Sequence, residues 1–139
     1  MRMPHCEKIQ IDASPERIWA CYANVGAWNS WDREVKEAYL DNGLQLPSEG
    51  FLVPRKGPKA KIRVVKCKPN GHFTIQSKLP LCAMNFEHYI FNLAGKSVVE
   101  HRIIFNGVLA PLFSLLVGRQ IYKALPGTLA SLKKAVEGN

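Results

Sequence analysis

Alternating hydrophobic and polar residues predict seven β-strands in this chain. A half-buried strand turns every second side chain inward, so its apolar residues recur with a period of two. Near the N-terminus, Ile9 and Ile11 alternate with Lys8 and Gln10, which predicts a first strand over residues 6–12. The other strands are expected at residues 34–40, 51–54, 61–68, 72–78, 84–93 and 97–106. The last two would form a long hairpin that turns at Ala94-Gly95.

Helical signals follow the first strand and recur at the end of the chain. Ser14 is a natural N-cap and Pro15 suits the first helical position, so a helix is expected over residues 14–24. Residues 27–32 predict a second short helix or turn. One apolar stripe predicts a long C-terminal helix through Phe113, Val117, Ile121, Leu125, Leu129, Leu132 and Val136. Pro126 lies inside it, where we expect a kink or a break.

Composition adds limits to this picture. The chain of 139 residues contains 47% hydrophobic and 22% charged residues, as is usual for one soluble globular domain, here expected over residues 1–139. Its longest apolar run, residues 109–118, is too short for a transmembrane helix, and the N-terminus has no apolar signal-peptide core. The four cysteines have no metal-binding spacing and are expected to be free thiols in the cytoplasm.

Positive charge is concentrated in one part of the sequence. The formal net charge is +8, and residues 50–86 contain no Asp or Glu. Basic residues of this stretch that could meet an anionic membrane or partner are Arg55, Lys56, Lys59, Lys61 and Arg63. The alternative is a hairpin whose charged face is simply solvated.

Three motifs carry a resemblance to a known family. They are I-x-A-S-P-E-R-I-W followed by W-N-S-W-D, then V-V-E-H-R-I-I-F-N-G-V-L-A, then L-P-G-T-L-A-S-L-K-K-A-V-E. With these three motifs in this order, the chain resembles the polyketide cyclase/dehydrase-like proteins of the SRPBCC superfamily. This superfamily includes START lipid-transfer domains and the birch-pollen allergen. The resemblance implies an α+β helix-grip fold, in which a seven-stranded antiparallel sheet curls around a long C-terminal helix and two short helices close one end. It also implies a central apolar cavity for a lipid, polyketide or similar molecule.

Two histidines are the candidate polar groups of that cavity. A two-residue turn at Ala94-Gly95 would place His88 opposite His101 among inward-facing apolar residues. The pair could hold a ligand carbonyl or hydroxyl, act as acid and base, or bond to each other, to Tyr or to water with no ligand role. Two histidines alone are a poor metal site, and the sequence contains no cofactor motif.

Other cavity-lining candidates follow from alternation on the strands and from position on the helices, with plain core packing as the alternative for each. The full candidate set is Trp28, Trp31, Phe51, Val53, Ile62, Val64, Phe73, Ile75, Phe86, His88, Ile90, Val99, His101, Ile103, Leu112, Phe113, Leu116 and Tyr122.

Three functions are therefore open. The first is binding or transport of a small hydrophobic ligand. The second is a cyclase/dehydrase-type enzyme in which a cavity histidine serves as general base. The third is docking of the basic stretch on an anionic membrane or partner. The sequence does not indicate an oligomeric state.

Overall fold

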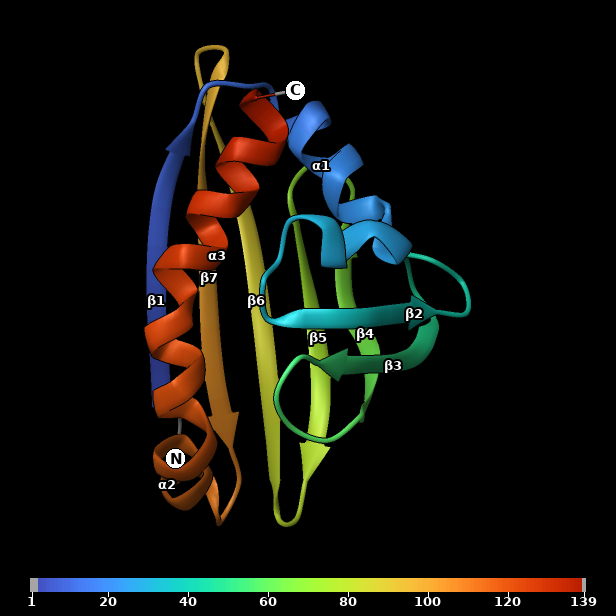
Figure 1. Cartoon of the computed structure of the whole chain (residues 1–139), viewed down its shortest axis with the longest axis vertical. Helices are drawn as coiled ribbons and strands as arrows, with labels where there is room; N and C mark the ends of the chain where they lie inside the picture. The colour runs from blue at the N-terminus through green and yellow to red at the C-terminus, as the bar shows by residue number, and fades with distance from the viewer. Residues whose placement is uncertain (1–2, 139) are drawn as a thin grey trace.

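A seven-stranded antiparallel sheet is wrapped around one face of a long helix in the computed structural model, which describes residues 3–138 (Figure 1). The strands are β1 (Met3–Ile11), β2 (Val35–Leu40), β3 (Ser48–Pro54), β4 (Ala60–Lys68), β5 (His72–Leu79), β6 (Cys82–Leu93) and β7 (Lys96–Asn106). Their order in the sheet is β1-β7-β6-β5-β4-β3-β2. This architecture confirms the predicted helix-grip fold.

Two short helices follow the first strand, as the sequence predicts. They are α1 (Pro15–Ala23) and the 3-10 helix η1 (Val25–Ser30). Ser14 Oγ accepts a hydrogen bond from the backbone N–H of Arg17 at 3.3 Å, and Pro15 opens the helix. The predicted cap therefore forms, and it directs the chain from the edge strand across the end of the sheet.

The C-terminal helical run is continuous but not uniform. It comprises α2 (Ala110–Phe113), a π-helical turn η2 (Ser114–Gly118) and α3 (Arg119–Glu137). Of the expected kink or break at Pro126, the break is wrong, because α3 passes through this residue, which lies on the exposed side; the kink stays a prediction. The irregularity lies earlier, at η2, where the sequence gives no proline signal.

The sheet curls most strongly at its β2–β3 end, where these strands run across the direction of the others (Figure 1). The pairing register shifts between Val64 and Lys66 on β4 and between Val35 and Glu37 on β2. These shifts mark two bulges, which increase the local twist. At Gly50, an added Cβ would lie 1.8 Å from the carbonyl oxygen of Tyr39. Only glycine permits this close approach of the β3 backbone to β2.

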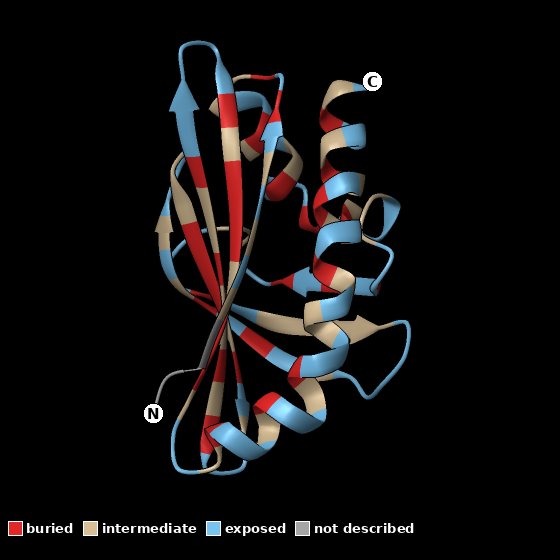
Figure 2. Ribbon diagram, turned by 90° about the vertical axis from the view of Figure 1, so that its left-hand side faces the viewer, coloured by how far each residue is buried: buried red, intermediate tan, exposed pale blue. Residues whose placement is uncertain are grey.

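Two hydrophobic clusters fill the space between the sheet and the helices. The upper cluster joins α1, η1 and the end of α3 to β4 and β5, and includes Tyr22, Phe73 and Leu129. The lower cluster joins α2 and the start of α3 to β6 and β7, and includes Phe105 and Leu125. Figure 2 shows the matching pattern on the long helix, with buried positions on one side and exposed positions on the other.

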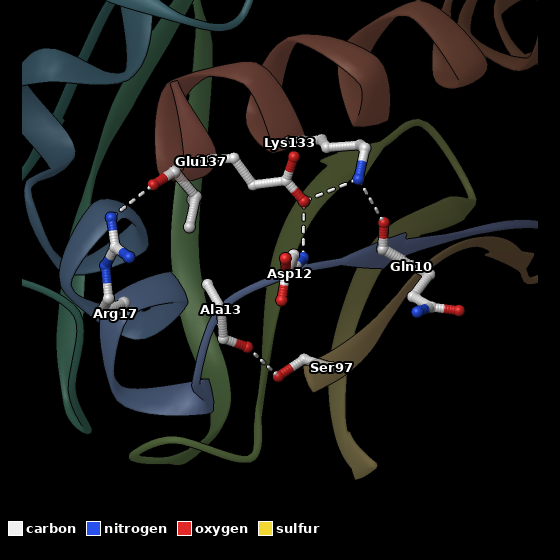
Figure 3. A network of polar contacts seen from close by, with 8 residues as sticks. Gln10, Asp12, Ala13, Arg17, Ser97, Lys133 and Glu137 are labelled. Carbon is white, nitrogen blue, oxygen red and sulfur yellow. Dashed lines mark hydrogen bonds and ion pairs between the residues drawn. The ribbon is translucent and has the colours of Figure 1, made fainter. Parts of the chain in front are cut away.

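Polar contacts fasten the end of α3 to the β1–α1 junction (Figure 3). Glu137 Oε2 accepts hydrogen bonds from the backbone N–H of Asp12 at 2.5 Å and from Lys133 Nζ at 2.6 Å. Lys133 Nζ also donates to the carbonyl of Gln10, and Arg17 donates to the carbonyl of Val136. These bonds satisfy backbone groups at the end of β1 and in the last turn of α3.

Candidate functional site

His88 and His101 face each other across the long β6–β7 hairpin. The register pairs them directly, as the two-residue turn predicts, and their ring centroids lie 4.5 Å apart. His101 is buried at 5% exposure, whereas His88 is half-buried. Both rings therefore lie on the inner face of the sheet, as expected.

Tyr22 joins this pair from α1. Its Oη lies 2.6 Å from His101 Nε2, within a strong hydrogen bond, and the tyrosine is 1% exposed. Tyr22 is a site residue that the sequence alone does not reveal. Its helical spacing from Ile18 marks it only as buried, and a contact between residues 22 and 101 depends on the packing of α1 over the sheet.

His88 is held in a defined orientation by Phe73 on the neighbouring strand β5. The two rings stack with centroids 4.0 Å apart and an interplanar angle of 6°. His88 Nδ1 donates to the Phe73 carbonyl at 3.3 Å, since a carbonyl oxygen can only accept. In the neutral ring with this tautomer, Nε2 carries the lone pair and can only accept a hydrogen bond.

Burial keeps this group of side chains uncharged at neutral pH. It lowers the pKa of His88 from 6.5 to about 4, although hydrogen bonds to the backbone of Phe73 and Phe86 oppose the shift. Burial, and then the neighbouring His88, lower the pKa of His101 well below its usual value. Burial likewise raises the pKa of Tyr22 well above 10. The group is therefore a neutral hydrogen-bonding cluster in an apolar setting, which we call the Tyr22–His101–His88 cluster.

Most other predicted lining residues on the strands do face inward. The residues buried in the two hydrophobic clusters are Ile62, Val64, Phe73, Ile75, Ile90, Val99 and Ile103. Phe86 is half-buried and packs against both clusters. Trp28 is also buried, and its Nε1 donates to the carbonyl of Tyr22 at 2.8 Å. Trp31 is half-buried at the edge of the upper cluster.

The expected inward orientation of Phe51 and Val53 is wrong. Phe51 pairs with Lys61 and with the exposed Tyr39, which places it on the outer face, and Val53 shares that face. Leu52 points inward instead and packs against the upper cluster. The segment F-L-V-P is apolar throughout, so its sequence does not indicate which alternate residues are buried, and the register decides.

Leu112 and Leu116 are also misplaced by the sequence analysis. They are 45% and 66% exposed and face solvent rather than the sheet. Phe113 and Tyr122 do pack against the lower cluster. The Tyr122 hydroxyl lies 2.8 Å from Ser114 Oγ, which is the polar partner that a buried tyrosine needs.

The two hollows that the structure describes differ from the expected central cavity. An open groove of about 590 Å³ lies between η1, the β3–β4 loop and α3, and its lining includes Trp31, Arg55 and Lys134. A second hollow of about 450 Å³ lies beside the last turns of α3. Neither is lined by the Tyr22–His101–His88 cluster, which lies among the side chains of the two hydrophobic clusters instead.

The five basic candidates of the 50–86 stretch are exposed, and Arg55 among them lines the groove beside α3. Arg55, Lys56 and Lys59 lie at the β3–β4 connection, and Lys61 and Arg63 project from the outer face of β4. The Lys59 ammonium lies 4.1 Å from the centre of the Phe51 ring. A cation–π contact of this kind accounts for the half-buried Phe51 on the outer face without any partner.

No potential metal site and no membrane-spanning helix occur in the described part of the chain. Nowhere between residues 3 and 138 do three or more His, Cys, Asp or Glu side chains gather as ligands. Over the same residues, each helix is too short or too polar to cross a bilayer. All four cysteines are free thiols.

Residues 7–137 match the family described as "Polyketide cyclase / dehydrase and lipid transport", and the chain belongs to this family. It is similar in fold to the Zhui aromatase/cyclase of a Streptomyces species, with a TM-score of 0.80, 11% identity, and coverage of 99% of this chain and 94% of that one. A START superfamily protein from Mycobacterium smegmatis gives a TM-score of 0.67 and 19% identity, with 97% and 94% coverage.

A third similar structure is the di-domain aromatase/cyclase StfQ from the steffimycin biosynthetic pathway, with a TM-score of 0.77 and 12% identity. The match covers 99% of this chain but 51% of StfQ, so the chain spans about half the length of that protein. No curated protein sequence matches this chain.

Proposed function

We propose that this protein binds a small hydrophobic molecule between the sheet and α3, with His88 as its polar contact. The observation that carries the proposal is the neutral Tyr22–His101–His88 cluster, placed on an otherwise apolar inner face. Ligand sites of this class combine apolar walls with a few oriented polar groups. Family membership supports the same class of ligand, since the family includes lipid transport.

The seam between the two hydrophobic clusters is the favoured position for the ligand. Phe86 contacts both clusters, and it is only half-buried although it faces inward. His88 on β6 and Ile121 on α3 are inward-facing and half-buried as well. A ligand that separates α3 from β6 along this seam would replace water on these side chains and bury apolar area of its own.

His88 would recognise a ligand that donates a hydrogen bond. Its Nδ1–H is already used by the Phe73 carbonyl, which leaves Nε2 as an acceptor. A hydroxyl on the ligand would complete this pairing. The stacked Phe73 ring fixes the imidazole before binding, so little conformational entropy would be lost.

Catalysis by a cyclase-type mechanism is the alternative within the same family. It needs a general base whose pKa lies near the operating pH. Burial lowers the pKa of His88 to about 4, which makes it a weak base at neutral pH. The electrostatics of the cluster therefore favour binding over proton abstraction.

A pair of probes of similar shape tests the proposal. We expect 1-naphthol to bind more tightly than 1-methylnaphthalene, by about three- to tenfold, because only naphthol can donate to His88. Calorimetric titration measures both affinities. His88→Phe should keep the affinity for 1-methylnaphthalene and abolish the preference for naphthol.

His72→Phe is the matched control, since His72 belongs to the adjacent strand and pairs across the outer face with Tyr89. This variant should behave as the unmodified protein does. Failure of both probes to bind, or an unchanged preference in His88→Phe, would refute the proposal. If the proposal holds, native mass spectrometry of the protein isolated from its own host identifies the natural ligand.

A further inference from the structure

Five large aliphatic side chains are exposed at one end of the molecule. They belong to the β5–β6 turn, the loop after β7, and the start of the C-terminal helical run. We call them the apolar tip: Leu81, Val108, Leu112, Leu115 and Leu116, with exposures of 70%, 81%, 45%, 59% and 66%. Single exposed leucines are common, but a contiguous group of this size marks an interaction surface.

The fold holds the tip together. The carbonyl of Leu81 accepts a hydrogen bond from the backbone N–H of Leu109 at 3.1 Å, which ties the β5–β6 turn to the loop after β7. Figure 1 shows this turn and α2 at the same end of the molecule, opposite the β6–β7 hairpin turn. Leu81 has a φ of 52°, a left-handed conformation that is uncommon for leucine.

The π-helical turn η2 sets which side chains face outward. Ser114 and Gly118 are buried against the sheet side, where Ser114 contacts Tyr122. The two consecutive residues Leu115 and Leu116 are consequently both exposed to solvent. Leu112, one turn earlier, is exposed as well. No described residue of this chain covers them.

Positive charge borders the tip and negative charge is absent from it. Lys78 and Arg119 are exposed three residues from Leu81 and Leu116 along the chain, and Lys123 is exposed two helical turns beyond Leu116. The two segments that carry the tip and these cations, residues 78–82 and 107–123, contain no Asp or Glu. An apolar surface with three cations in its own segments, and no acidic residue in them, complements an anionic phospholipid surface.

We propose that the apolar tip docks this protein on anionic phospholipid bilayers. The five aliphatic side chains would enter the boundary between headgroups and acyl chains, and Lys78, Arg119 and Lys123 would pair with lipid phosphates. No described helix is able to span a bilayer, so the contact is interfacial. The proposal does not depend on the ligand proposed above, and it concerns a different surface from the basic residues Arg55 to Arg63.

Vesicle co-sedimentation tests this docking. The protein should bind phosphatidylcholine vesicles that contain phosphatidylglycerol, bind pure phosphatidylcholine far less, and release as salt is raised. Leu115→Glu/Leu116→Glu should weaken binding about tenfold or more, because two apolar contacts are replaced by charges that the lipid repels. Arg119→Gln/Lys123→Gln should weaken it roughly fivefold per charge and flatten the salt dependence.

Two controls separate this surface from others. Leu93→Glu alters a leucine that is 52% exposed in the β6–β7 turn at the opposite end, and it should bind as the unmodified protein does. Lys61→Gln/Arg63→Gln should also leave binding unchanged. Val108→Glu gives a second tip variant outside any helix, should the double variant fold poorly.

Results of three kinds, each on a different measurement or set of variants, would overturn the proposal. One is no binding to the anionic vesicles at low salt. Another is unchanged binding by both tip variants, or loss of binding in Lys61→Gln/Arg63→Gln. The third is a dimer in analytical ultracentrifugation that the tip variants convert to monomer while vesicle binding stays the same, which would assign the tip to a second copy of the chain.

Discussion

At the scale of single residues, the centre of the protein depends on side chains that stay neutral. The Tyr22–His101–His88 cluster joins α1 to the β6–β7 hairpin by one hydrogen bond of 2.6 Å and by ring contacts. Charging either imidazole would place a cation among apolar neighbours. The folded state therefore resists protonation, whereas the unfolded chain does not.

This difference predicts a pH-dependent stability. Because the pKa of His88 falls from 6.5 to about 4 on folding, the unfolded state binds more protons below pH 6.5. The free energy of unfolding should decrease as the pH falls from about 6.5 towards 4, by roughly 3 kcal/mol for His88 alone. Urea denaturation at several pH values measures it.

His88→Gln supplies the comparison, because glutamine keeps a polar amide but does not titrate. Its stability should depend less steeply on pH over the same interval. Burial is the main cause of a raised pKa at Asp32, which changes the stability in the opposite sense. Because Asp32 is present in both proteins, its contribution cancels in the comparison. Equal slopes in the two proteins would contradict the assignment of a neutral buried His88.

At the scale of elements, the contact between the helical run and β7 depends on one small residue. Gly118 ends η2, and an added Cβ would lie 2.9 Å from the Tyr122 ring and 3.1 Å from Phe105. The helix approaches the sheet closely because no side chain intervenes. Gly127, nine residues later in α3, has nothing within 4 Å of such a Cβ.

The two glycines therefore predict opposite effects of one substitution. Gly118→Ala should destabilise the protein by about 1–3 kcal/mol, since Tyr122 and Phe105 would have to shift. Gly127→Ala should stabilise it by about 0.5–1 kcal/mol, because alanine favours a helix and meets no neighbour here. Thermal and urea unfolding of both variants provide the measurement. A stabilising Gly118→Ala would show that α3 does not pack as described.

At the scale of the whole molecule, residues from opposite ends of the chain are held together. Glu137 accepts from the backbone N–H of Asp12, and Lys133 reaches the carbonyl of Gln10 (Figure 3). The last turns of α3 thus close the upper cluster against the first strand. Ser97 adds a buried bond to the carbonyl of Ala13 from the start of β7.

Removal of the Glu137 carboxylate should open this end locally. In Glu137→Ala we expect faster hydrogen exchange at the Asp12 amide and in the last turn of α3, with the amides of β6 and β7 unchanged. Exchange followed by NMR resolves these sites. Lys134→Ala is the control, because Lys134 is exposed and takes no part in these bonds; equal exchange in both variants would argue against the contact.

The sequence by itself determined the elements and much of their pairing. Period-two alternation, the Ser14-Pro15 cap and the apolar stripe of the C-terminal helix are local signals, and the predicted elements are present in the structure, although alternation assigned the wrong inner face to β3. The two-residue turn at Ala94-Gly95 even fixed the His88–His101 pair, because register in a hairpin follows from its turn.

Only the tertiary structure decided the rest. On β3, Leu52 faces inward because pairing with β4 sets the register. The segment F-L-V-P is apolar throughout and does not indicate which residues face inward. Tyr22 became a partner of His101 only when α1 packed across the sheet, a contact over 79 positions of sequence. The exposure of Leu112 and Leu116 depends on η2 and on which side of the helix meets β7, and no local pattern encodes a contact between distant elements.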